Sequence, residues 1–464
     1  MEEQKNQAET RIEKDSMGEI EVPVNALWGA QTERSRQNFK IGGEKMPPEL
    51  VEALVLVKKM AAIANQETGK LSKEKANAIK SAAQQLLDEP QWEAFPLVVW
   101  QTGSGTQSNM NTNEVIAHLA SNERIDIHPN DDVNMSQSSN DVFPTAIHIA
   151  STLAIEKNLL PQLDKMIVAL KQLEEANQSI IKIGRTHLQD ATPVTFSQEI
   201  SGWRAGLEHN KRMLIDSLAE LKQLAIGGTA VGTGLNATEA YEQTFLSALQ
   251  KETGVHFIGD PNKFHALANR DAVVFVSGAL KALAANCMKM ANDIRWLASG
   301  PRSGLGEITI PANEPGSSIM PGKVNPTQCE ALSMVAVQVM GNDTAIGIAA
   351  SQGNFELNVY LPLIAFDLLQ SIRLLSDSLD SFTEKCLKGL KVNEERMAEL
   401  LSRSLMLVTA LNTHIGYDKG AEIAKKAFNE GTTLKEAALN LGYVTEDDYE
   451  RWVRPEKMIG GKKA

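Results

Sequence analysis

The chain has 464 residues, of which 42% are hydrophobic, 22% charged and 5% aromatic, a balance typical of a globular protein with a large core. Its 58 acidic residues outnumber its 46 basic residues, for a formal net charge of -12. This charge counts against nucleic-acid binding. It does not exclude a small anionic substrate, because the field inside a binding site is local.

The cysteines and the N-terminal stretch show no sign of export. Cys287, Cys329 and Cys386 are isolated, without metal-ligand or redox spacing. The stretch MEEQKNQAETRIEKDSMGEIEVP is polar and rich in acids, unlike a signal or transit peptide. Charged residues interrupt every apolar run before it reaches the roughly 20 residues of a membrane helix. We therefore expect a cytoplasmic protein without a membrane partner.

Helical periodicity dominates the chain. It begins at Pro48 and continues to Leu87, and after a polar interruption a second helix is expected near Asn113. From residue 138 to residue 391 the pattern predicts about five long helices of roughly 25 to 35 residues, well above the usual mean of about 12. Helices of this kind form bundles. Their apolar surface exceeds what one bundle covers, so we expect other subunits to cover the rest.

These observations predict a mainly α protein with three consecutive domains. Residues 1–137 are expected to form a mostly helical N-terminal domain. Residues 138–391 are expected to form a central long-helix bundle, which is also the core of an oligomer. Residues 392–464 are expected to form a small C-terminal helical domain with shorter helices.

Four polar stretches interrupt the helical pattern. None matches a Walker A loop, an HExxH helix, an EF-hand loop or a GxSxG elbow. Each is rich in Ser, Thr, Asn or Gly, which favours helix caps and also favours anion binding by free N–H groups and hydroxyls. The four are TGSGTQSNMN (102–111), HPNDDVNMSQSSNDVFP (128–144), GRTHLQDATP (184–193) and GSSIMPGKVNP (316–326). A fifth, GGTAVGTGLN (227–236), has no preceding strand, so we expect no nucleotide site there.

Two histidines lie in these stretches. His187 is off any apolar face and beside a polar turn, which raises the expectation of a catalytic role above that of an average histidine. His128, with Asp131 and Asp132, lacks recognised metal-ligand spacing, and a helix start is the better interpretation.

The last polar stretch ends in another predicted helix start. Asn325 is expected to cap this helix, Pro326 to be its first residue, and Gln328 to complete a capping box. Glu330 then lies one turn into the helix, where an acid is favourable in any case. The preceding segment, 300–322, has no helical signal, and loops of this length are commonly functional.

At this point the motifs are recognisable. GSSIMPGKVNP resembles the signature of the fumarase/aspartase superfamily. SGTQSNMN, HPNDDVNMSQSSND, GRTHLQDATP and GNFELN (353–358) extend the resemblance along nearly the whole chain, and together they are similar to the class II, iron-independent fumarases. The resemblance implies a three-domain fumarase/aspartase-like fold and a homotetramer with active sites shared between subunits. It also implies reversible hydration of fumarate to (S)-malate, a lyase reaction of the tricarboxylic acid cycle, with no metal and no other cofactor.

The resemblance further implies roles for individual residues. Ser317 would be the base, Lys323 would stabilise charge, His187 would handle the hydroxyl group through a bound water, and Glu330 would orient the imidazole. The implied substrate-binding positions are Ser104, Gly105, Thr106, Ser138, Ser139, Asn140, Thr186, Ser318, Lys323, Val324 and Asn325.

A second anion site is implied at His128, Pro129, Asn130 and Asp131. The family usually has a basic residue three places before that histidine. This chain has Ile125 there, with Arg124 one place further away, and the departure counts against the second site.

Two alternatives remain open. One is aspartate ammonia-lyase on the same scaffold, although aspartases carry a sequence like GQLQLN where this chain has GNFELN. The other is a catalytically silent structural relative, which the intact Ser317, Lys323, His187 and Glu330 argue against.

Overall fold

The computed structural model describes residues 9–460 and is mainly α, as the sequence predicts. Strands in this range form only two-stranded sheets. Contacts divide the chain into two compact units. Unit 1 comprises Met1–Pro161, Asn210–Ala284 and Val335–Ser376, and unit 2 comprises Gln162–His209, Ala285–Met334 and Asp377–Ala464. The three consecutive domains expected from the sequence stay a prediction.

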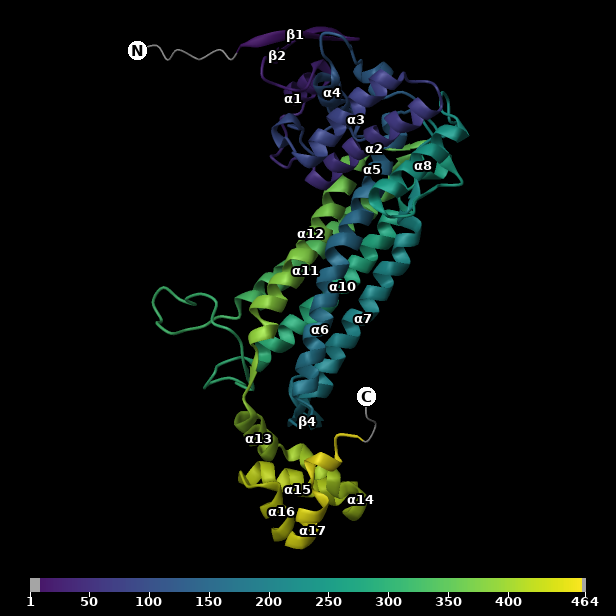
Figure 1. Cartoon of the computed structure of the whole chain (residues 1–464). Helices are drawn as coiled ribbons and strands as arrows, with labels where there is room; N and C mark the ends of the chain where they lie inside the picture. Colours follow the sequence, from purple (N-terminus) through teal and green to yellow (C-terminus); the bar gives the residue numbers. More distant parts are fainter. Residues whose placement is uncertain (1–8, 461–464) are drawn as a thin grey trace, which may run out of the picture. The chain divides into compact units, whose positions relative to one another are not determined.

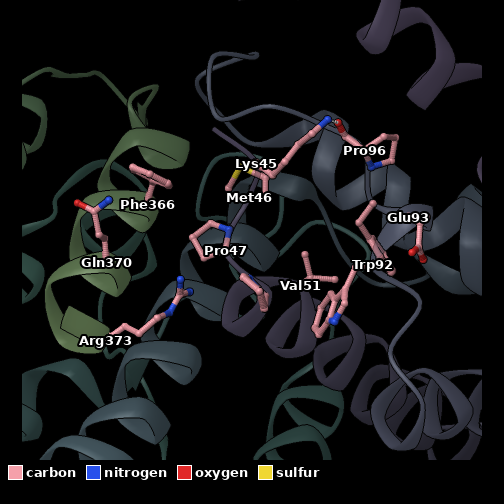
Figure 2. A pocket seen from close by; sticks show the side chains of 12 residues that line it. Lys45, Met46, Pro47, Val51, Trp92, Glu93, Pro96, Phe366, Gln370 and Arg373 are labelled. Carbon is pink, nitrogen blue, oxygen red and sulfur yellow. Dashed lines mark hydrogen bonds between the residues drawn. The ribbon is translucent and has the colours of Figure 1, made fainter. Parts of the chain in front are cut away.

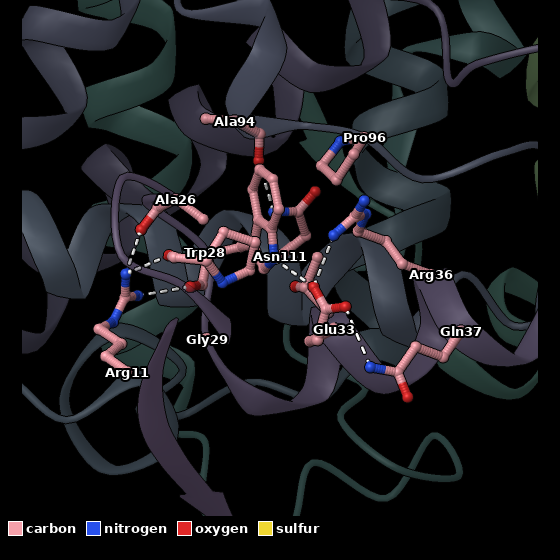
Figure 3. Close-up of polar contacts among 12 residues, drawn as sticks. Arg11, Ala26, Trp28, Gly29, Glu33, Arg36, Gln37, Ala94, Pro96 and Asn111 are labelled. Atoms are coloured by element: carbon pink, nitrogen blue, oxygen red, sulfur yellow. Dashed lines mark hydrogen bonds and ion pairs between the residues drawn. The ribbon is translucent and has the colours of Figure 1, made fainter. Parts of the chain in front are cut away.

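Unit 1 begins with an antiparallel hairpin, β1 (Thr10–Asp15) and β2 (Gly18–Pro23), followed by α1 (Ala30–Asn38). Polar contacts hold the segment in place (Figure 3): the Arg11 guanidinium donates to the carbonyls of Ala26 and Trp28 at 2.7 and 2.8 Å. The Glu33 carboxylate accepts from Trp28 Nε1 at 2.9 Å and from Arg36 Nη1 at 2.7 Å. Charged side chains therefore connect β1, the loop that contains Ala26 and Trp28, and α1.

A buried carboxylate joins α1 to α4 (Thr106–Ala120). Glu114, on α4, accepts the backbone N–H groups of Gly29, Gln31 and Thr32 at 2.8 to 3.2 Å and the Thr32 hydroxyl at 2.5 Å. These are the N–H groups that the first turn of a helix leaves without intrahelical partners, and a negative charge there also suits the helix dipole. Glu114 thus fixes α4 against the start of α1.

The core of unit 1 packs around α2 (Pro48–Glu67) and α3 (Lys73–Asp88), in the segment where helical periodicity is predicted. Helices α4, α5 (Ser139–Ala154) and α8 (Glu239–Thr253) pack against α2. The expected start of a helix near Asn113 is wrong, because α4 begins at Thr106. Gly105 adopts a left-handed conformation at φ 74° and turns the chain into the helix seven residues earlier than the apolar pattern indicates.

The long helices predicted for the middle of the chain are present and are labelled in Figure 1. Helix α5 continues through a π-helical turn, η3 (Ile155–Leu159), into α6 (Leu160–Ala176). The others are α7 (Phe196–Leu221), α10 (Asp271–Leu297), α11 (Thr327–Ala350) and α12 (Leu361–Lys385), of 24 to 27 residues each. Between α10 and α11 the chain has no helix and one short strand, β7 (Ile308–Thr309), as expected for that segment.

Two of these helices, α10 and α11, are long and apolar enough to cross a membrane by length and composition alone. The sequence reading predicts no such segment. The criterion is weak for one or two helices, because a core helix of a water-soluble protein meets it equally well.

Unit 2 contains a hairpin of β3 (Ile181–Thr186) and β4 (Gln189–Thr195) and a cluster of C-terminal helices. A buried charge cluster anchors the hairpin: the fully buried Glu307 carboxylate accepts both terminal nitrogens of Arg185 at 3.0 Å and lies 3.4 Å from Lys182 Nζ. The helices are α13 (Glu394–Arg403), η5 (Leu405–Leu411), α14 (Asn412–Ile415), α15 (Tyr417–Glu430), α16 (Leu434–Asn440) and α17 (Glu446–Trp452). They share an apolar core with Ile183 of β3.

Short elements complete the described chain. They are η1 (Trp92–Ala94), η2 (Pro129–Val133), β5 (Gln223–Leu224), β6 (Ile258–Gly259), α9 (Lys263–Ala268), β8 (Gly353–Asn354), β9 (Leu357–Asn358), η4 (Leu387–Gly389), β10 (Lys391–Val392) and η6 (Pro455–Lys457).

Candidate active site

Two helix N-termini in unit 1 bring two of the polar stretches together. Thr106 opens α4 and Ser139 opens α5, and their hydroxyl oxygens are 2.8 Å apart. Ser104 extends this chain of hydroxyls, with its oxygen 2.7 Å from that of Thr106. Helix N-termini present free N–H groups and positive dipole ends, so this arrangement suits a carboxylate.

The start of α5 is fixed by a capping box. The Ser138 hydroxyl accepts the Asn140 N–H at 3.2 Å, and the Asp141 carboxylate accepts the Ser138 N–H at 2.9 Å. Asp141 is fully buried and also accepts the N–H groups of Gly227 and Thr229 at 3.0 and 2.9 Å. Burial raises the pKa of Asp141 to about 6, against these backbone hydrogen bonds, which lower it. The predicted helix start at SSND is confirmed.

Glycines allow the close approaches in TGSG. At Gly105 a Cβ atom would lie 2.2 Å from the Phe143 ring, and at Gly103 it would lie 1.5 Å from the carbonyl oxygen of Val359. No other residue fits either position without moving its neighbours. The hydroxyls of Ser104 and Thr106 are therefore presented on a tightly packed backbone.

Thr106, Ser138 and Ser139 line a cavity of about 770 Å³ that lies within unit 1. Its walls are mainly polar and come from η2, α4, the start of α5 and the 229–236 loop. They include Thr106, Asn109, Asn130, Asp131, Asn134, Gln137, Ser138, Ser139 and Thr229. The cavity is large enough for a small dicarboxylate together with water.

The GSSIMPGKVN loop of unit 2 encloses Ser317. Its hydroxyl oxygen accepts the backbone N–H groups of Ile319 at 3.2 Å and Met320 at 3.0 Å. The loop is closed by the Gly316 N–H, which donates to the Lys323 carbonyl at 2.9 Å, and by Asn325 Nδ2, which donates to the Gly316 carbonyl at 2.6 Å. A Cβ atom at Gly316 would lie 2.4 Å from the Lys323 carbonyl oxygen, so the closure requires glycine.

This loop corrects two expectations about the start of α11. Asn325 does not cap the helix, because its side chain donates back to Gly316. Gln328 does not form a capping box, because its side-chain oxygen accepts the Ser381 hydroxyl at 2.9 Å. Helix α11 begins at Thr327, one residue later than predicted. The Asn325 side chain therefore closes the loop that precedes α11 instead of capping the helix.

His187 lies at the tip of the β3–β4 hairpin. It and Leu188 adopt left-handed conformations, with φ of 56° and 60°, as in a tight two-residue hairpin turn. Thr186 and His187 are exposed, as are Ser318, Lys323, Val324 and Glu330. Within the part of the chain that the structure describes, the side chains of His187 and Glu330 make no hydrogen bond or ion pair. The histidine and the carboxylate for which the resemblance implies catalytic roles are thus unpartnered in the described part of a single chain.

Residues His128 to Asp131, where the resemblance implies a second anion site, form the helix start that the sequence predicts. His128 caps η2, and its Nδ1 accepts the N–H groups of Asn130 and Asp131 at 3.3 and 3.1 Å. The same Nδ1 lies 3.4 Å from a carboxylate oxygen of Asp131. No group of three or more His, Cys, Asp or Glu residues that could hold a metal occurs among residues 9–460.

Three features were missed from the sequence. The N–H donors of Ile319 and Met320 belong to the backbone, so no side-chain pattern announces them. The GGTAVGTGLN stretch lines the cavity and binds Asp141, although only a nucleotide site was considered there. Cys329 and Cys386, far apart in sequence, are buried free thiols that influence one another: Cys386 lowers the pKa of Cys329, and Cys329 raises the pKa of Cys386.

A separate cavity of about 440 Å³ lies within unit 1 (Figure 2). Its lining is mostly apolar and aromatic, including Trp92, Phe95 and Phe366. Two cations also line it, Lys45 and Arg373, and Arg373 is paired with Glu49. It contains none of the predicted site residues.

Comparisons with known proteins bear directly on these features. Residues 18–341 match a family described as "Lyase", and residues 407–460 match one described as "Fumarase C C-terminus". The chain is 59% identical over 461 residues to a protein named fumarate hydratase class II from Bacillus anthracis, covering 98% of this chain and 100% of that relative. It is 58% identical over 459 residues to one of the same name from Helicobacter pylori, covering 97% and 99%.

Solved structures agree with this result. A class II fumarase from Schistosoma mansoni has a TM-score of 0.95 and 41% sequence identity, covering 97% of this chain and 99% of that chain. A structure titled "fumarate lyase:delta crystallin from Brucella melitensis bound to cobalt" has a TM-score of 0.92 and 40% identity, covering 97% and 100%.

The helix-rich fold is that of a lyase, and the chain belongs to this lyase family, among the class II fumarate hydratases. The resemblance inferred from the motifs is thereby confirmed, and with it the fold class and the assignment as an enzyme.

Proposed function

We propose that the protein catalyses the reversible, stereospecific hydration of fumarate to (S)-malate. The observation that carries the proposal is the position of the Ser317 oxygen against two backbone N–H groups, in a chain related to class II fumarate hydratases along nearly its whole length. These groups supply what a serine base needs, because its alkoxide forms only where donors stabilise it.

The chemical difficulty is the C3 proton of malate, which lies beside a carboxylate and is very weakly acidic. In the proposed mechanism Ser317 removes it, and the extra negative charge spreads onto the carboxylate oxygens. Lys323 and Asn325 are proposed to bind these oxygens, since preorganised donors contribute roughly 3 to 4 kcal/mol each to such a transition state. Closure of the loop over the substrate would exclude water and strengthen these contacts.

The hydroxyl group leaves on the other side of the substrate. We assign its protonation to His187, acting through a bound water, with Glu330 orienting the imidazole. Ser104, Gly105, Thr106, Ser138, Ser139, Asn140, Thr186, Ser318 and Val324 are proposed to bind the carboxylates. The second anion site at His128 to Asp131 stays a prediction, and two of its residues, Asn130 and Asp131, also line the unit 1 cavity.

We also propose a homotetramer with active sites shared between subunits. Large apolar side chains on the long helices are exposed in a single chain, at 52% for Phe275, 68% for Met334, 61% for Val337 and 62% for Ile348. Exposed apolar surface on this scale marks an interaction site. The unpartnered His187 and Glu330 are consistent with partners supplied by other subunits. The expected cytoplasmic location stays a prediction.

A direct assay tests the proposed reaction. Fumarate absorbs in the ultraviolet, so its appearance from (S)-malate can be followed continuously, beside parallel reactions with (R)-malate and aspartate. We expect fumarate from (S)-malate alone. Release of ammonia from aspartate would favour the aspartase alternative, and inactivity toward all three substrates would favour a silent structural relative.

A further inference from the structure

The unit 1 cavity has one lysine, Lys70, on its wall for a doubly negative substrate. The hydroxyls and amides that line it are neutral. Lys70 is the cation among its lining residues, and its Nζ donates to the Asn236 carbonyl at 2.6 Å and lies 3.3 Å from the Ser136 hydroxyl. Asp131, also on the wall, is 84% exposed and has the opposite charge. Lys70 and, in the proposed mechanism, Lys323 each bring one positive charge to the substrate, and a cation behind the wall would add to their potential.

Lys58 of α2 lies behind this wall. The residue is fully buried, with 0% of its surface exposed. Its Nζ donates to Asn134 Oδ1 at 3.0 Å and to Gln137 Oε1 at 2.9 Å. Both amides line the cavity, so Lys58 is separated from the cavity by one layer of polar side chains.

The amides form a connected network around the ammonium group. Asn134 Oδ1 also accepts Nδ2 of Asn109 and of Asn113, each at 3.2 Å. The Asn134 amide nitrogen donates to the Gln137 carbonyl at 3.2 Å. Hydrogen bonds that begin at a charged donor are roughly twice as strong as neutral ones and polarise the groups they reach. Gln137 Nε2 donates to the carbonyls of Val133 and Met135 at 3.1 and 2.9 Å, so Gln137 holds Lys58 in place and does not itself donate to an anion. The positive charge therefore reaches the cavity through the polarised Asn134 amide and through the field of the ammonium group.

Building on the proposed function, we propose that Lys58 is the buried cation that attracts the dicarboxylate substrate, acting through Asn134 from behind the cavity wall while Gln137 holds it in place. It is a positioning residue, because two amides stand between it and the cavity. The field of a charge in low-dielectric surroundings is poorly screened, so a single buried ammonium group can act across that distance.

The charge on Lys58 is sensitive to its surroundings near neutral pH. Burial lowers the pKa of Lys58 to about 7, whereas Asp141, on α5, favours the charged form. From α8, burial raises the pKa of Tyr241, which stays neutral. On η2, Asp132 is paired with Lys75, and Asp131 is exposed. A bound dianion favours protonated Lys58, so binding should weaken as the pH rises above 7.

The substitution Lys58→Met keeps the length of the side chain and removes its charge. We expect the KM for fumarate at pH 7 to rise about tenfold or more while kcat changes by less than about threefold, the pattern of lost ground-state binding. Lys59→Met is the matched control, since Lys59 is the next residue of α2 and its Nζ pairs with Glu252 instead. An unchanged KM in folded, tetrameric Lys58→Met would overturn the proposal.

The pH dependence of KM distinguishes a charged Lys58 that acts on the substrate from a Lys58 that only supports the fold. In the wild type we expect KM to rise between pH 7 and 8.5, and in Lys58→Met to stay flat over that range. If KM rises by the same amount in Lys58→Met, another titratable group is responsible, and the inference is overturned.

If Lys58→Met does not fold, calorimetry with succinate, an unreactive dicarboxylate, tests the proposal on folded proteins instead. Titration of the wild type and of His187→Asn at pH 7.5, in two buffers of different ionisation enthalpy, measures protons taken up on binding. We expect uptake in both proteins, and its absence would overturn the proposal. Wild-type protein that binds succinate but does not hydrate fumarate would contradict the proposed function alone.

Discussion

Ser317 gains its proposed basicity from two neighbours that contribute only backbone. The N–H groups of Ile319 and Met320 reach its oxygen at 3.2 and 3.0 Å because Gly316 and Asn325 close the loop. Substitution of either hydrophobic side chain would leave these donors in place. The chemistry therefore depends on the loop conformation as much as on the serine.

We expect Ser317→Ala to lower turnover by roughly two to four decades, the usual scale for a positioned acid–base group. Substrate affinity should fall much less, because the hydroxyls of unit 1 and Lys323 remain. Steady-state kinetics with (S)-malate would measure both quantities, with Ser402→Ala, at an exposed position of α13 outside the proposed site, as the control. Wild-type turnover in Ser317→Ala would remove this residue as the base.

His148, on α5, couples stability to acid. Burial lowers its pKa from 6.5 to about 4, and its Nδ1 lies 2.8 Å from the Gln223 carbonyl oxygen. Because the folded-state pKa is below the unfolded value, the unfolded chain binds more protons between these pH values, and stability falls as the pH drops through this window. The loss from this group between pH 7.5 and pH 5 is roughly 2 kcal/mol.

The His148→Gln variant removes this titration. Urea unfolding of both proteins at pH 7.5 and pH 5 should show a smaller acid-induced loss in the variant, by about the same roughly 2 kcal/mol. Equal losses in the two proteins would show that His148 is not the group responsible.

At the scale of elements, the contact between α1 and α4 depends on one carboxylate from α4. Glu114 satisfies three N–H groups at the start of α1, and α4 begins at Thr106, one of the cavity hydroxyls. Glu114 therefore caps α1 and also holds in place α4, the helix that carries Thr106, a predicted substrate contact. A cap supplied by a distant helix is a tertiary contact that local sequence does not encode.

We expect Glu114→Gln to destabilise the protein by about 1 to 3 kcal/mol, because the amide nitrogen would face N–H donors in a buried place. Thermal unfolding should show a lower midpoint, whereas KM well below that temperature should change little. Glu123→Gln, at an exposed loop position, is the control and should leave the midpoint unchanged. A wild-type midpoint in Glu114→Gln would contradict the capping role.

For the whole molecule, the exposed apolar residues on α10 and α11 predict assembly, and the shared site predicts complementation. Subunits carrying His187→Asn, when dissociated and refolded with subunits carrying Ser317→Ala, should regain activity, because some mixed sites would receive both wild-type residues. Each variant refolded alone is the control. A fully active monomer would defeat the idea. A tetramer whose mixtures stay inactive would place both residues on the same chain.

The absence of a metal is a further expectation for the intact enzyme. Activity should survive exhaustive treatment with EDTA and exposure to oxygen, because the resemblance implies chemistry by side chains and backbone donors alone. Loss of activity with EDTA that one added metal restores would show that the enzyme needs a metal.

Local sequence was sufficient for the helices, the capping box at Ser138 and Asp141, and the polar stretches, because periodicity and cap residues act over a few neighbouring positions. It was also sufficient for the family, because the motifs are long. It failed at Asn325 and Gln328, whose side chains bind Gly316 and Ser381 instead of the helix start.

Only the tertiary structure placed Thr106 2.8 Å from Ser139, Glu114 at the start of α1, and Lys58 behind Asn134 and Gln137. Each of these contacts joins residues 33 to 85 positions apart. They depend on how helices pack, and packing is decided by the shape and burial of whole faces, not by the residues next to each group in the chain.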